Sequence, residues 1–265
     1  MTDSIVVYND TNASGGKKLG LNHSAAADYT EFSLDVTQAG TYNVIGRVMK
    51  ASNNSIIQLS IDGVDIGTPI DTFWSTTEKY KDFQFGTFNF SYPGSYLFRI
   101  TTTGKNASAS GYRLQLDYFT LTQAPTTVIV DNADAGVSKV GLWDTNSSAT
   151  DKYGNNYNFV LSTNTDGGTK SVTFTPQLTG AGTYNVYIWW PAHFNRATNI
   201  PVDIVHASGT ASVSIDETSN GGQWNLVGSY SFAAGTTGYV KIRTDSVNGV
   251  NGVVVADAVR FVPVP

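Results

Sequence analysis

Short segments in which apolar and polar residues alternate recur along the whole chain, separated by Gly, Asn, Asp, Ser and Pro. Because successive side chains of a strand point to opposite faces of a sheet, this alternation predicts half-buried β-strands. No segment has a convincing helical period. Regularly spaced short strands with turn residues between them are typical of a β-sandwich or jelly roll, so we predict an all-β chain.

The expected strands fall into two groups. In the first half they lie near residues 5–8, 29–36, 41–49, 55–61, 83–90, 95–102 and 113–121. In the second half they lie near residues 127–131, 157–160, 170–178, 183–190, 200–205, 210–215, 225–232, 238–243 and 253–262. Between the groups, Pro125 lies among small residues and cannot donate a hydrogen bond to a strand ladder. We therefore predict two domains, residues 1–123 and 124–265, joined by a short linker.

The two halves repeat the same motifs in the same order. The segment Ala39–Val44 recurs as Ala181–Val186, and each half ends in an apolar run with one embedded acid, Asp117 or Asp257. Solenoid and propeller repeats recur at about 20 to 50 residues, a much shorter spacing than this one. The repeat therefore predicts two tandem antiparallel β-sandwich (jelly-roll) domains of one architecture.

Alternation also assigns the faces of the repeated strand. In the first copy it places three side chains in the core: Tyr42, Val44 and Val48. In the second copy it places four there: Tyr184, Val186, Ile188 and Trp190. Tyr187 and Trp189 then lie on the outer face, where two aromatic rings require either a covering loop or a ligand.

Composition removes several classes of protein. Only 14% of the 265 residues are charged, whereas about a quarter is usual in soluble domains. The net charge is -5 and no Lys/Arg cluster interleaves with the aromatic residues, so we expect no nucleic-acid partner. No apolar stretch approaches the roughly 20 residues that span a bilayer, so we expect no membrane partner. The absence of cysteine excludes disulfides and thiolate metal sites.

The motifs of each half are similar to those of a known family. The first half resembles the family 6 and family 35 carbohydrate-binding modules through the segments Asp28–Phe32, Ala39–Val44 with Arg47, Ile61–Gly63, Tyr80–Phe83 and Leu116–Phe119. The second half resembles the golvesin C-terminal-like domain of bacterial polysaccharide lyases and other exoenzymes through the segments Gly141–Trp143, Trp189–Ala192, Gly221–Trp224 and Ala256–Phe261.

The first resemblance implies a sugar site in the loops at one edge of the sandwich. In the family pattern two aromatic side chains hold the sugar and an Asn of the last loop hydrogen-bonds it. By motif these positions fall on Tyr29, Tyr80 and Gln115, with Trp74 competing for the second aromatic position. Aromatic faces suit the C–H patches of sugar rings, and a few polar groups fix the hydroxyls. The alternatives are a core or rim role for Tyr29 and a loop-anchoring role for Trp74.

Tyr187 and Trp189 are the ligand candidates of the second half. Aligning the repeated motifs places Ser171 at the position of Tyr29, so the second half lacks that aromatic. We therefore expect the first domain to bind glycan and the second to contribute mainly structure. If Tyr187 and Trp189 bind a ligand on the outer face, this division is reversed.

Asp10 and Asp117 are candidates for a metal site. Burying a carboxylate in an apolar strand is costly unless it is paired, hydrogen-bonded or bound to a metal. Oxygen ligands suit calcium, and the first resemblance implies a structural calcium. However, Val7 and Tyr8 replace the acidic residues usual in the first strand of those modules. Two interpretations stay open: a structural calcium, or an Asp117 held only by hydrogen bonds.

Catalytic motifs are weak in this sequence. Paired carboxylates could serve glycoside hydrolysis, and the candidate pairs are Asp62/Asp65, Glu78/Asp82 and Asp216/Glu217. All lie in expected turns or loops, where solvated carboxylates are the rule. The three histidines, His23, His193 and His206, lie far apart without metal-ligand spacing. We therefore expect no enzymatic activity.

Together these patterns predict a non-catalytic polysaccharide-binding tandem module of a secreted bacterial carbohydrate-active enzyme, which would raise the local concentration of enzyme on its substrate. Met1–Ser4 has neither the basic nor the apolar region of a signal peptide. Either the chain is cytoplasmic, or it is a piece of a longer chain whose signal lies elsewhere. Because of the two resemblances we expect the second, an extracellular piece with a catalytic domain covalently attached. The alternative is a structural or adhesion spacer that docks a neighbouring catalytic domain.

Overall fold

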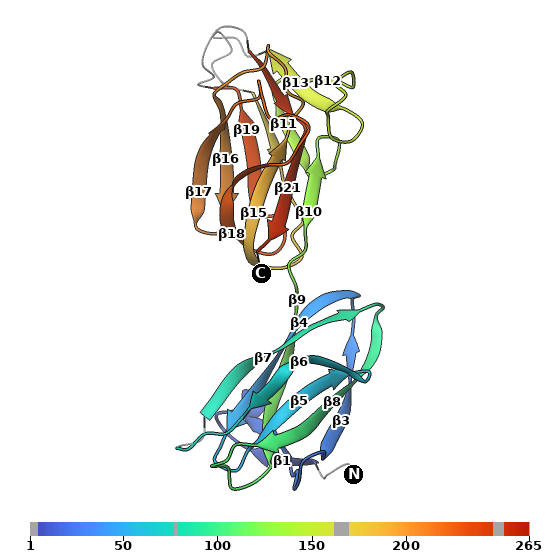
Figure 1. Ribbon diagram of the computed structural model, residues 1–265, viewed down its shortest axis with the longest axis vertical. Coiled ribbons are helices and arrows are strands. Elements are labelled where there is room, and N and C mark those ends of the chain that lie inside the picture. The colour runs from blue at the N-terminus through green and yellow to red at the C-terminus, as the bar shows by residue number, and fades with distance from the viewer. Residues whose placement is uncertain (1–4, 77–78, 162–169, 246–251, 265) are drawn as a thin grey trace. The chain divides into compact units, whose positions relative to one another are not determined.

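A computed structural model of the chain describes residues 5–76, 79–161, 170–245 and 252–264 (Figure 1). The described residues form antiparallel sheets, with one short 3-10 helix at Ser14–Gly16 and no α-helix. No helix in these ranges has the length and apolar character needed to cross a membrane. The chain divides into two compact units, Met1–Ala124 and Pro125–Pro265. The predicted all-β class of tandem antiparallel sandwiches is confirmed.

The first unit consists of two sheets. One has the strand order β1 (Ile5–Asn9), β2 (Lys17–Leu21), β9 (Leu114–Gln123), β4 (Gly40–Lys50) and β7 (Lys79–Phe90). The other has the order β3 (Tyr29–Val36), β8 (Gly94–Lys105), β5 (Ser55–Ile61) and β6 (Val64–Asp71). Apolar side chains of both sheets meet in one core, with Phe90 and Phe98 fully buried in it.

One row of paired residues crosses the first of these sheets. Gly20 pairs with Gln115, Gln115 pairs with Met49, and Met49 pairs with Tyr80. Directly opposed residues of neighbouring antiparallel strands point to the same face of a sheet. Since Val48, which precedes Met49, is fully buried in the core, this row lies on the outer face.

The described residues of the second unit form three sheets. The first has the order β10 (Val128–Asp131), β21 (Ala258–Pro263), β15 (Gly182–Trp189) and β18 (Asn225–Phe232). The second has the order β11 (Val137–Val140), β14 (Ser171–Phe174), β19 (Tyr239–Arg243), β16 (Ile200–His206) and β17 (Gly209–Ile215). A small third sheet has the order β12 (Asp144–Asn146), β13 (Tyr157–Leu161) and β20 (Val253–Ala256).

The repeated motif has the same structural role in both units. The Tyr42 hydroxyl donates to the Gln38 carbonyl at 3.2 Å, and the Tyr184 hydroxyl donates to the Gly180 carbonyl at 2.7 Å. Each tyrosine thus ties its strand to the turn four residues upstream, as the tyrosine corner of other sandwiches does. The predicted inward positions of both copies are confirmed, because all seven side chains are buried.

Several strands differ from the prediction. β2, β6, β11 and β12 were not expected, since their segments contain too many Gly, Lys, Asp or Thr residues to show a clear apolar alternation. The strand expected at 253–262 is interrupted at Asp257, and its two parts, β20 and β21, belong to different sheets. Predicted strand 170–178 ends at Phe174. Three of the four unexpected strands, β6, β11 and β12, lie at sheet edges, whereas β2 lies between β1 and β9.

Candidate functional site

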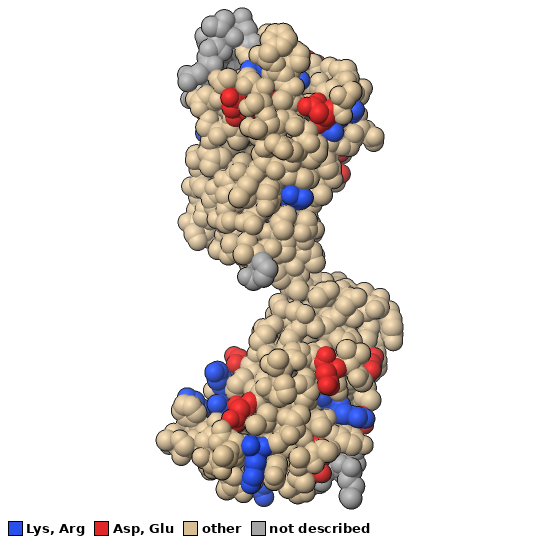
Figure 2. All heavy atoms as spheres, viewed as in Figure 1, with Lys and Arg blue, Asp and Glu red and all other residues tan. Residues whose placement is uncertain are grey.

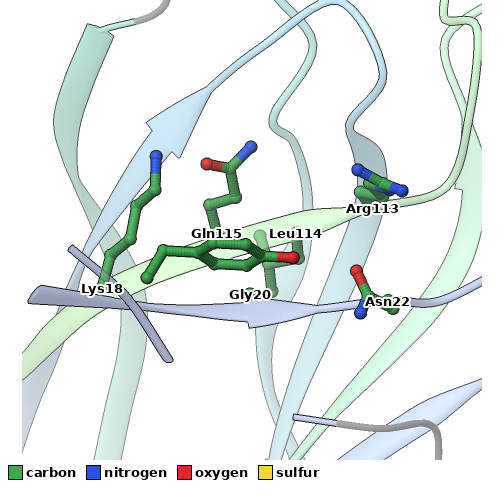
Figure 3. A pocket seen from close by; sticks show the side chains of 7 residues that line it. Lys18, Gly20, Asn22, Arg113, Leu114 and Gln115 are labelled. Atoms are coloured by element: carbon green, nitrogen blue, oxygen red, sulfur yellow. The ribbon is translucent and has the colours of Figure 1, made fainter. Parts of the chain in front are cut away.

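A cavity of about 210 Å³ lies in the first unit between the β1–β2 hairpin and the start of β9. Its lining consists of one aromatic ring, two cations, two amides and two small or apolar residues: Tyr8, Lys18, Asn22, Arg113, Gln115, Gly20 and Leu114. In Figure 3, Lys18 and Gln115 lie toward one end of this cavity, and Asn22 and Arg113 lie toward the other. No carboxylate is among its lining residues.

The ring of Tyr8 lies directly over the backbone of Gly20. A Cβ atom built on Gly20 would come within 2.3 Å of Tyr8 Cε2, so any larger residue would displace the ring. Tyr8 is 39% exposed, which leaves part of its ring open to solvent. Glycine in a strand interior often marks a place where another group approaches the backbone closely. Here it creates a flat aromatic surface beside the polar residues of the cavity.

The polar groups around this ring have unused hydrogen-bonding capacity. Among the described residues, the side-chain amides of Asn22 and Gln115 have no hydrogen-bond partner, and each offers donors and an acceptor. Lys18 Nζ lies 3.0 Å from Asp10 Oδ2 and 2.9 Å from Met49 Sδ, a weak acceptor. An aromatic face with a few placed polar groups is the arrangement that binds a sugar ring.

The structure brings only part of the predicted sugar site together. Gln115 lines the cavity, and Tyr80 lies in the same outer-face row, two strands away. The Tyr80 hydroxyl donates to Asp10 Oδ2 at 2.8 Å and its ring lies 5.0 Å from the Arg47 guanidinium. Burial, together with the hydrogen bond to Asp10, raises the pKa of Tyr80. Tyr80 therefore supports the hairpin that carries Tyr8 and does not line the cavity.

Tyr29 and Trp74 lie elsewhere. Tyr29 is on β3 in the other sheet of the unit, where the Arg99 guanidinium lies 4.4 Å from its ring centroid. The ring of Trp74 has Lys79 Nζ at 3.4 Å and Lys50 Nζ at 5.1 Å from its centroid. Neither residue lines the cavity with Gln115. Of the four residues predicted to surround one sugar, only Gln115 therefore lines this cavity, and the aromatic ring in its lining is that of Tyr8.

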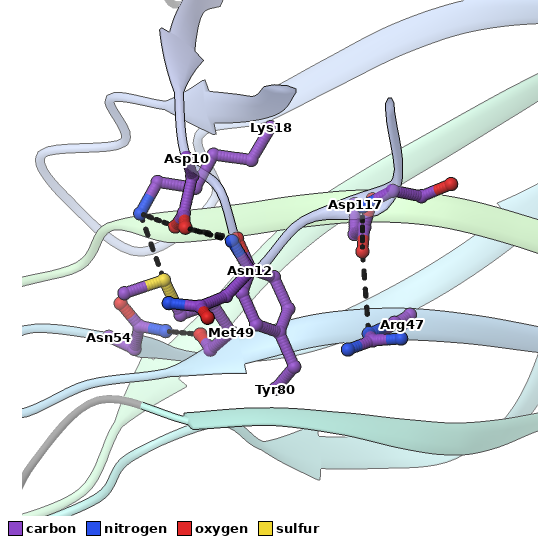
Figure 4. A network of polar contacts seen from close by, with 9 residues as sticks. Asp10, Asn12, Lys18, Arg47, Met49, Asn54, Tyr80 and Asp117 are labelled. Atoms are coloured by element: carbon purple, nitrogen blue, oxygen red, sulfur yellow. Dashed lines mark hydrogen bonds and ion pairs between the residues drawn. The ribbon is translucent and has the colours of Figure 1, made fainter. Parts of the chain in front are cut away.

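Asp10 and Asp117 belong to a network of ion pairs (Figure 4). Asp117 is fully buried, accepts from the Ser14 N–H at 2.9 Å and lies 3.3 Å from Arg47 Nε. Hydrogen bonds from the Asn12 N–H, Lys18 and Tyr80 lower the pKa of Asp10.

The carboxylates of this network do not fit a calcium site. Asp10 already pairs with Lys18, and Asp117 pairs with Arg47. In each pair the side-chain cation balances the negative charge that a metal would otherwise balance. No group of three acidic, His or Cys residues in the described ranges could hold a metal ion. The arrangement matches the hydrogen-bonded interpretation with an added ion pair.

In the second unit, a loop covers the outer-face aromatics. Trp189 Nε1 donates to the Asp151 carbonyl at 2.8 Å, and its ring lies 5.7 Å from Tyr153 and 5.4 Å from Trp224. The Arg260 guanidinium lies 4.6 Å from the ring centroids of both Tyr187 and Trp224. The rings of Tyr187 and Trp189 therefore pack within their own unit and form no open ligand platform.

Two acids of the second unit are fully buried. Asp257 accepts from the Tyr153 N–H at 2.9 Å, and burial raises its pKa to about 8. Glu217 accepts from the Val255 N–H at 2.8 Å, and burial raises its pKa well above the ordinary value. One oxygen of each carboxyl has no hydrogen-bond partner among the described residues.

The carboxylate pairs considered for catalysis have structural environments. Asp62 accepts from the Leu97 N–H at 2.8 Å and Asp216 accepts from the Thr218 N–H at 2.8 Å, so both stabilise turns. Glu78 lies outside the described residues. His23 is buried between the hydroxyls of Thr102 and Thr30 at 2.7 Å and 3.0 Å.

Comparison with known families assigns both units. Residues 2–123 match the carbohydrate binding module (family 6), and residues 128–263 match the Golvesin C-terminal domain. The chain therefore belongs to the golvesin C-terminal domain family, and its first unit matches the family 6 carbohydrate binding module. Both resemblances expected from the sequence are confirmed.

The two xanthan lyases among the relatives are longer than this chain. A solved structure of a Paenibacillus xanthan lyase is 58% identical, with a TM-score of 0.69, and the match covers 100% of this chain and 25% of that one. A xanthan lyase of Bacillus sp. (strain GL1) is 54% identical over 139 residues, which is 52% of this chain and 15% of the relative. A family 35 carbohydrate binding module from Clostridium thermocellum is 20% identical, with a TM-score of 0.32, over 46% of this chain and 89% of that one. The chain thus spans a quarter or less of the length of the two lyases.

Proposed function

We propose that this chain is a non-catalytic polysaccharide-binding tandem module of a secreted bacterial polysaccharide lyase that acts on xanthan. The first unit binds the glycan through the cavity beside Tyr8. The second unit is a structural partner of the first. In the full-length enzyme, a covalently attached catalytic domain is held on its substrate by these weak contacts.

The observation that carries this proposal is the part-exposed ring of Tyr8 lying against Gly20. An aromatic face supported by backbone gains little for the stability of its own unit, since part of it remains in water. Beside it, the amides of Asn22 and Gln115 are free to bond hydroxyls. The family assignment and the 58% identity to a xanthan lyase over the whole chain support the substrate class.

Affinity measurement with xanthan tests the proposal. Tyr8→Ala removes the aromatic face and should weaken binding of the full chain at least about tenfold, as truncation of a central aromatic commonly does. Tyr92→Ala is the matched control, because Tyr92 is also exposed, at 58%, and lies in the same unit outside the cavity. Equal affinities of Tyr8→Ala and the unchanged chain, or lyase activity of the isolated chain, would contradict the proposal.

A spacer role is the second candidate for the second unit, and one observation favours it. Its outer-face aromatics, Tyr187, Trp189 and Trp224, contact a loop and an arginine of their own unit. Such packing rigidifies a module without preparing it for a ligand. If xanthan binding depends on the first unit alone, the second serves as the spacer between the binding module and its neighbours.

A further inference from the structure

We propose that the cavity beside Tyr8 selects an anionic saccharide and that Arg113 binds its carboxylate. This inference rests on the proposed glycan-binding function and adds the chemical class of the sugar and the residue that recognises it. It rests on a difference between the two cations of the cavity lining: among the described residues Lys18 has a carboxylate partner, and Arg113 has none.

Lys18 already has a carboxylate partner. Its ammonium lies 3.0 Å from Asp10, and its side chain is 11% exposed. The same ammonium lies against Met49 Sδ at 2.9 Å, which leaves one of its three N–H groups for a strong acceptor in the cavity. Because Asp10 balances its charge, Lys18 is suited to donate to a neutral hydroxyl or ring oxygen.

Arg113 has no such partner. Among the described residues, no carboxylate lies within ion-pair distance of its guanidinium, whereas Arg47, Arg99 and Arg243 all have one. Its backbone is fixed, since its N–H donates to the Asn53 carbonyl at 3.0 Å and its carbonyl accepts from the Ser55 N–H at 2.9 Å. A guanidinium on a fixed backbone presents paired donors that match the two oxygens of a carboxylate.

The positive charge that would attract an anion is confined to the cavity. The chain as a whole carries a net charge of -5, so long-range attraction does not favour an anionic glycan. On the face seen in Figure 2, positive and negative side chains are sparse and interspersed on both units. The positive character of the cavity is therefore local, and it arises because its lining includes Lys18 and Arg113 and no acid.

The arrangement defines how the sugar lies. The ring packs on Tyr8, and the amides of Gln115 and Asn22 bond its hydroxyls. The carboxylate points toward the end of the cavity where Figure 3 shows Arg113. A neutral sugar would fill the same space and leave the guanidinium in water.

The test compares xanthan with xanthan whose carboxyl groups have been reduced to alcohols, by calorimetry on the full chain. Reduction should weaken binding about tenfold, the value of one charge-assisted hydrogen-bonded pair. Arg113→Gln should weaken binding to native xanthan by a similar factor and leave binding to the reduced form unchanged. Arg113→Lys keeps the charge and should give an intermediate affinity for native xanthan.

Lys139→Gln is the control for net charge, because Lys139 is exposed on β11 in the other unit. It should leave both affinities unchanged. Two results would overturn the inference, and they are distinguishable. Equal binding of both polymers, lost on Tyr8→Ala and unaffected by Arg113→Gln, would mean a neutral-sugar site and would leave the proposed function intact. Binding of neither polymer by the unchanged chain would contradict the proposed function itself.

Discussion

Asp117 in the first unit and Asp257 in the second lie in the last apolar segments of two similar sandwiches, and both are fully buried. Asp117 faces the Arg47 guanidinium and accepts from the Ser14 N–H. Asp257 accepts from the Tyr153 N–H, has no cation within ion-pair distance among the described residues, and has a pKa of about 8. The first unit thus neutralises its buried acid with a partner, and the second keeps its acid protonated at neutral pH.

The loops that reach these acids differ in how they leave the neighbouring aromatic rings. In the first, the β1–β2 turn brings Ser14 to Asp117, and the adjoining hairpin leaves Tyr8 open over Gly20. In the second, the β12–β13 loop brings Tyr153 to Asp257 and packs against Trp189. The same architecture therefore presents an open aromatic in one unit and encloses its aromatics in the other.

The largest expected effect is a pH dependence confined to the second unit. Asp257 is protonated in the folded state up to about pH 8, whereas in the unfolded chain it loses its proton near its ordinary pKa of 3.8. Between these values the folded state binds one proton more than the unfolded state. The free energy of unfolding should therefore fall as pH rises, by about 1.4 kcal/mol per pH unit, and level off above pH 8.

Urea unfolding followed by tryptophan fluorescence checks this, since Trp143, Trp189, Trp190 and Trp224 all lie in the second unit. Asp257→Asn keeps the acceptor for Tyr153 and should flatten the slope. Part of the slope should remain, because Glu217 is buried with its pKa raised in the same direction. An unchanged slope in Asp257→Asn would show that Asp257 is not the group responsible.

The next effect concerns the ion pair of the first unit. Arg47→Met keeps an apolar stem and leaves Asp117 buried without a cation, which should lower the stability of the first unit. Amide hydrogen exchange of β4 and β9 in the full chain measures the loss. The double variant Arg47→Met/Asp117→Asn removes both charges and should recover most of it. A double variant as unstable as the single one would mean that the ion pair is not the cause.

Trp189→Ala should destabilise the second unit by about 2–3 kcal/mol, since a half-buried tryptophan loses contacts with Tyr153 and Trp224. The affinity of the full chain for xanthan should not change. Denaturation and calorimetry on the same sample separate the two readouts. A loss of affinity without a loss of stability would place the glycan site in the second unit.

The smallest expected change is Gly20→Ala, whose added Cβ would meet the Tyr8 ring at 2.3 Å. Displacing the ring should reduce xanthan affinity about fivefold, while stability changes by less than about 1 kcal/mol. Gly104→Ala is the control, because a Cβ built there has no neighbour within 4 Å. Equal affinities of the two variants would show that the position of the Tyr8 ring does not matter.

The sequence predicted the core faces and did not predict the lining of the cavity beside Tyr8, for one physical reason. Core faces such as that of Tyr42, Val44 and Val48 follow a period of two residues, which a single segment reveals. The cavity is built from a hairpin and a distant strand, and Tyr8 and Arg113 become neighbours only through sheet pairing. The one local signal for the cavity was Tyr8, an exposed tyrosine of β1, whose partner strand β2 contains Gly20.

The most direct test of the central claim is an NMR titration of the full chain with xanthan oligosaccharides, observing backbone amides and indole N–H groups. The account predicts chemical-shift changes at the Gly20 amide and the Gln115 side-chain amide, and none at the indole N–H groups of Trp189 and Trp224. The opposite pattern, with shifts at the two indoles and none at Gly20 or Gln115, would contradict the assignment of glycan binding to the first unit.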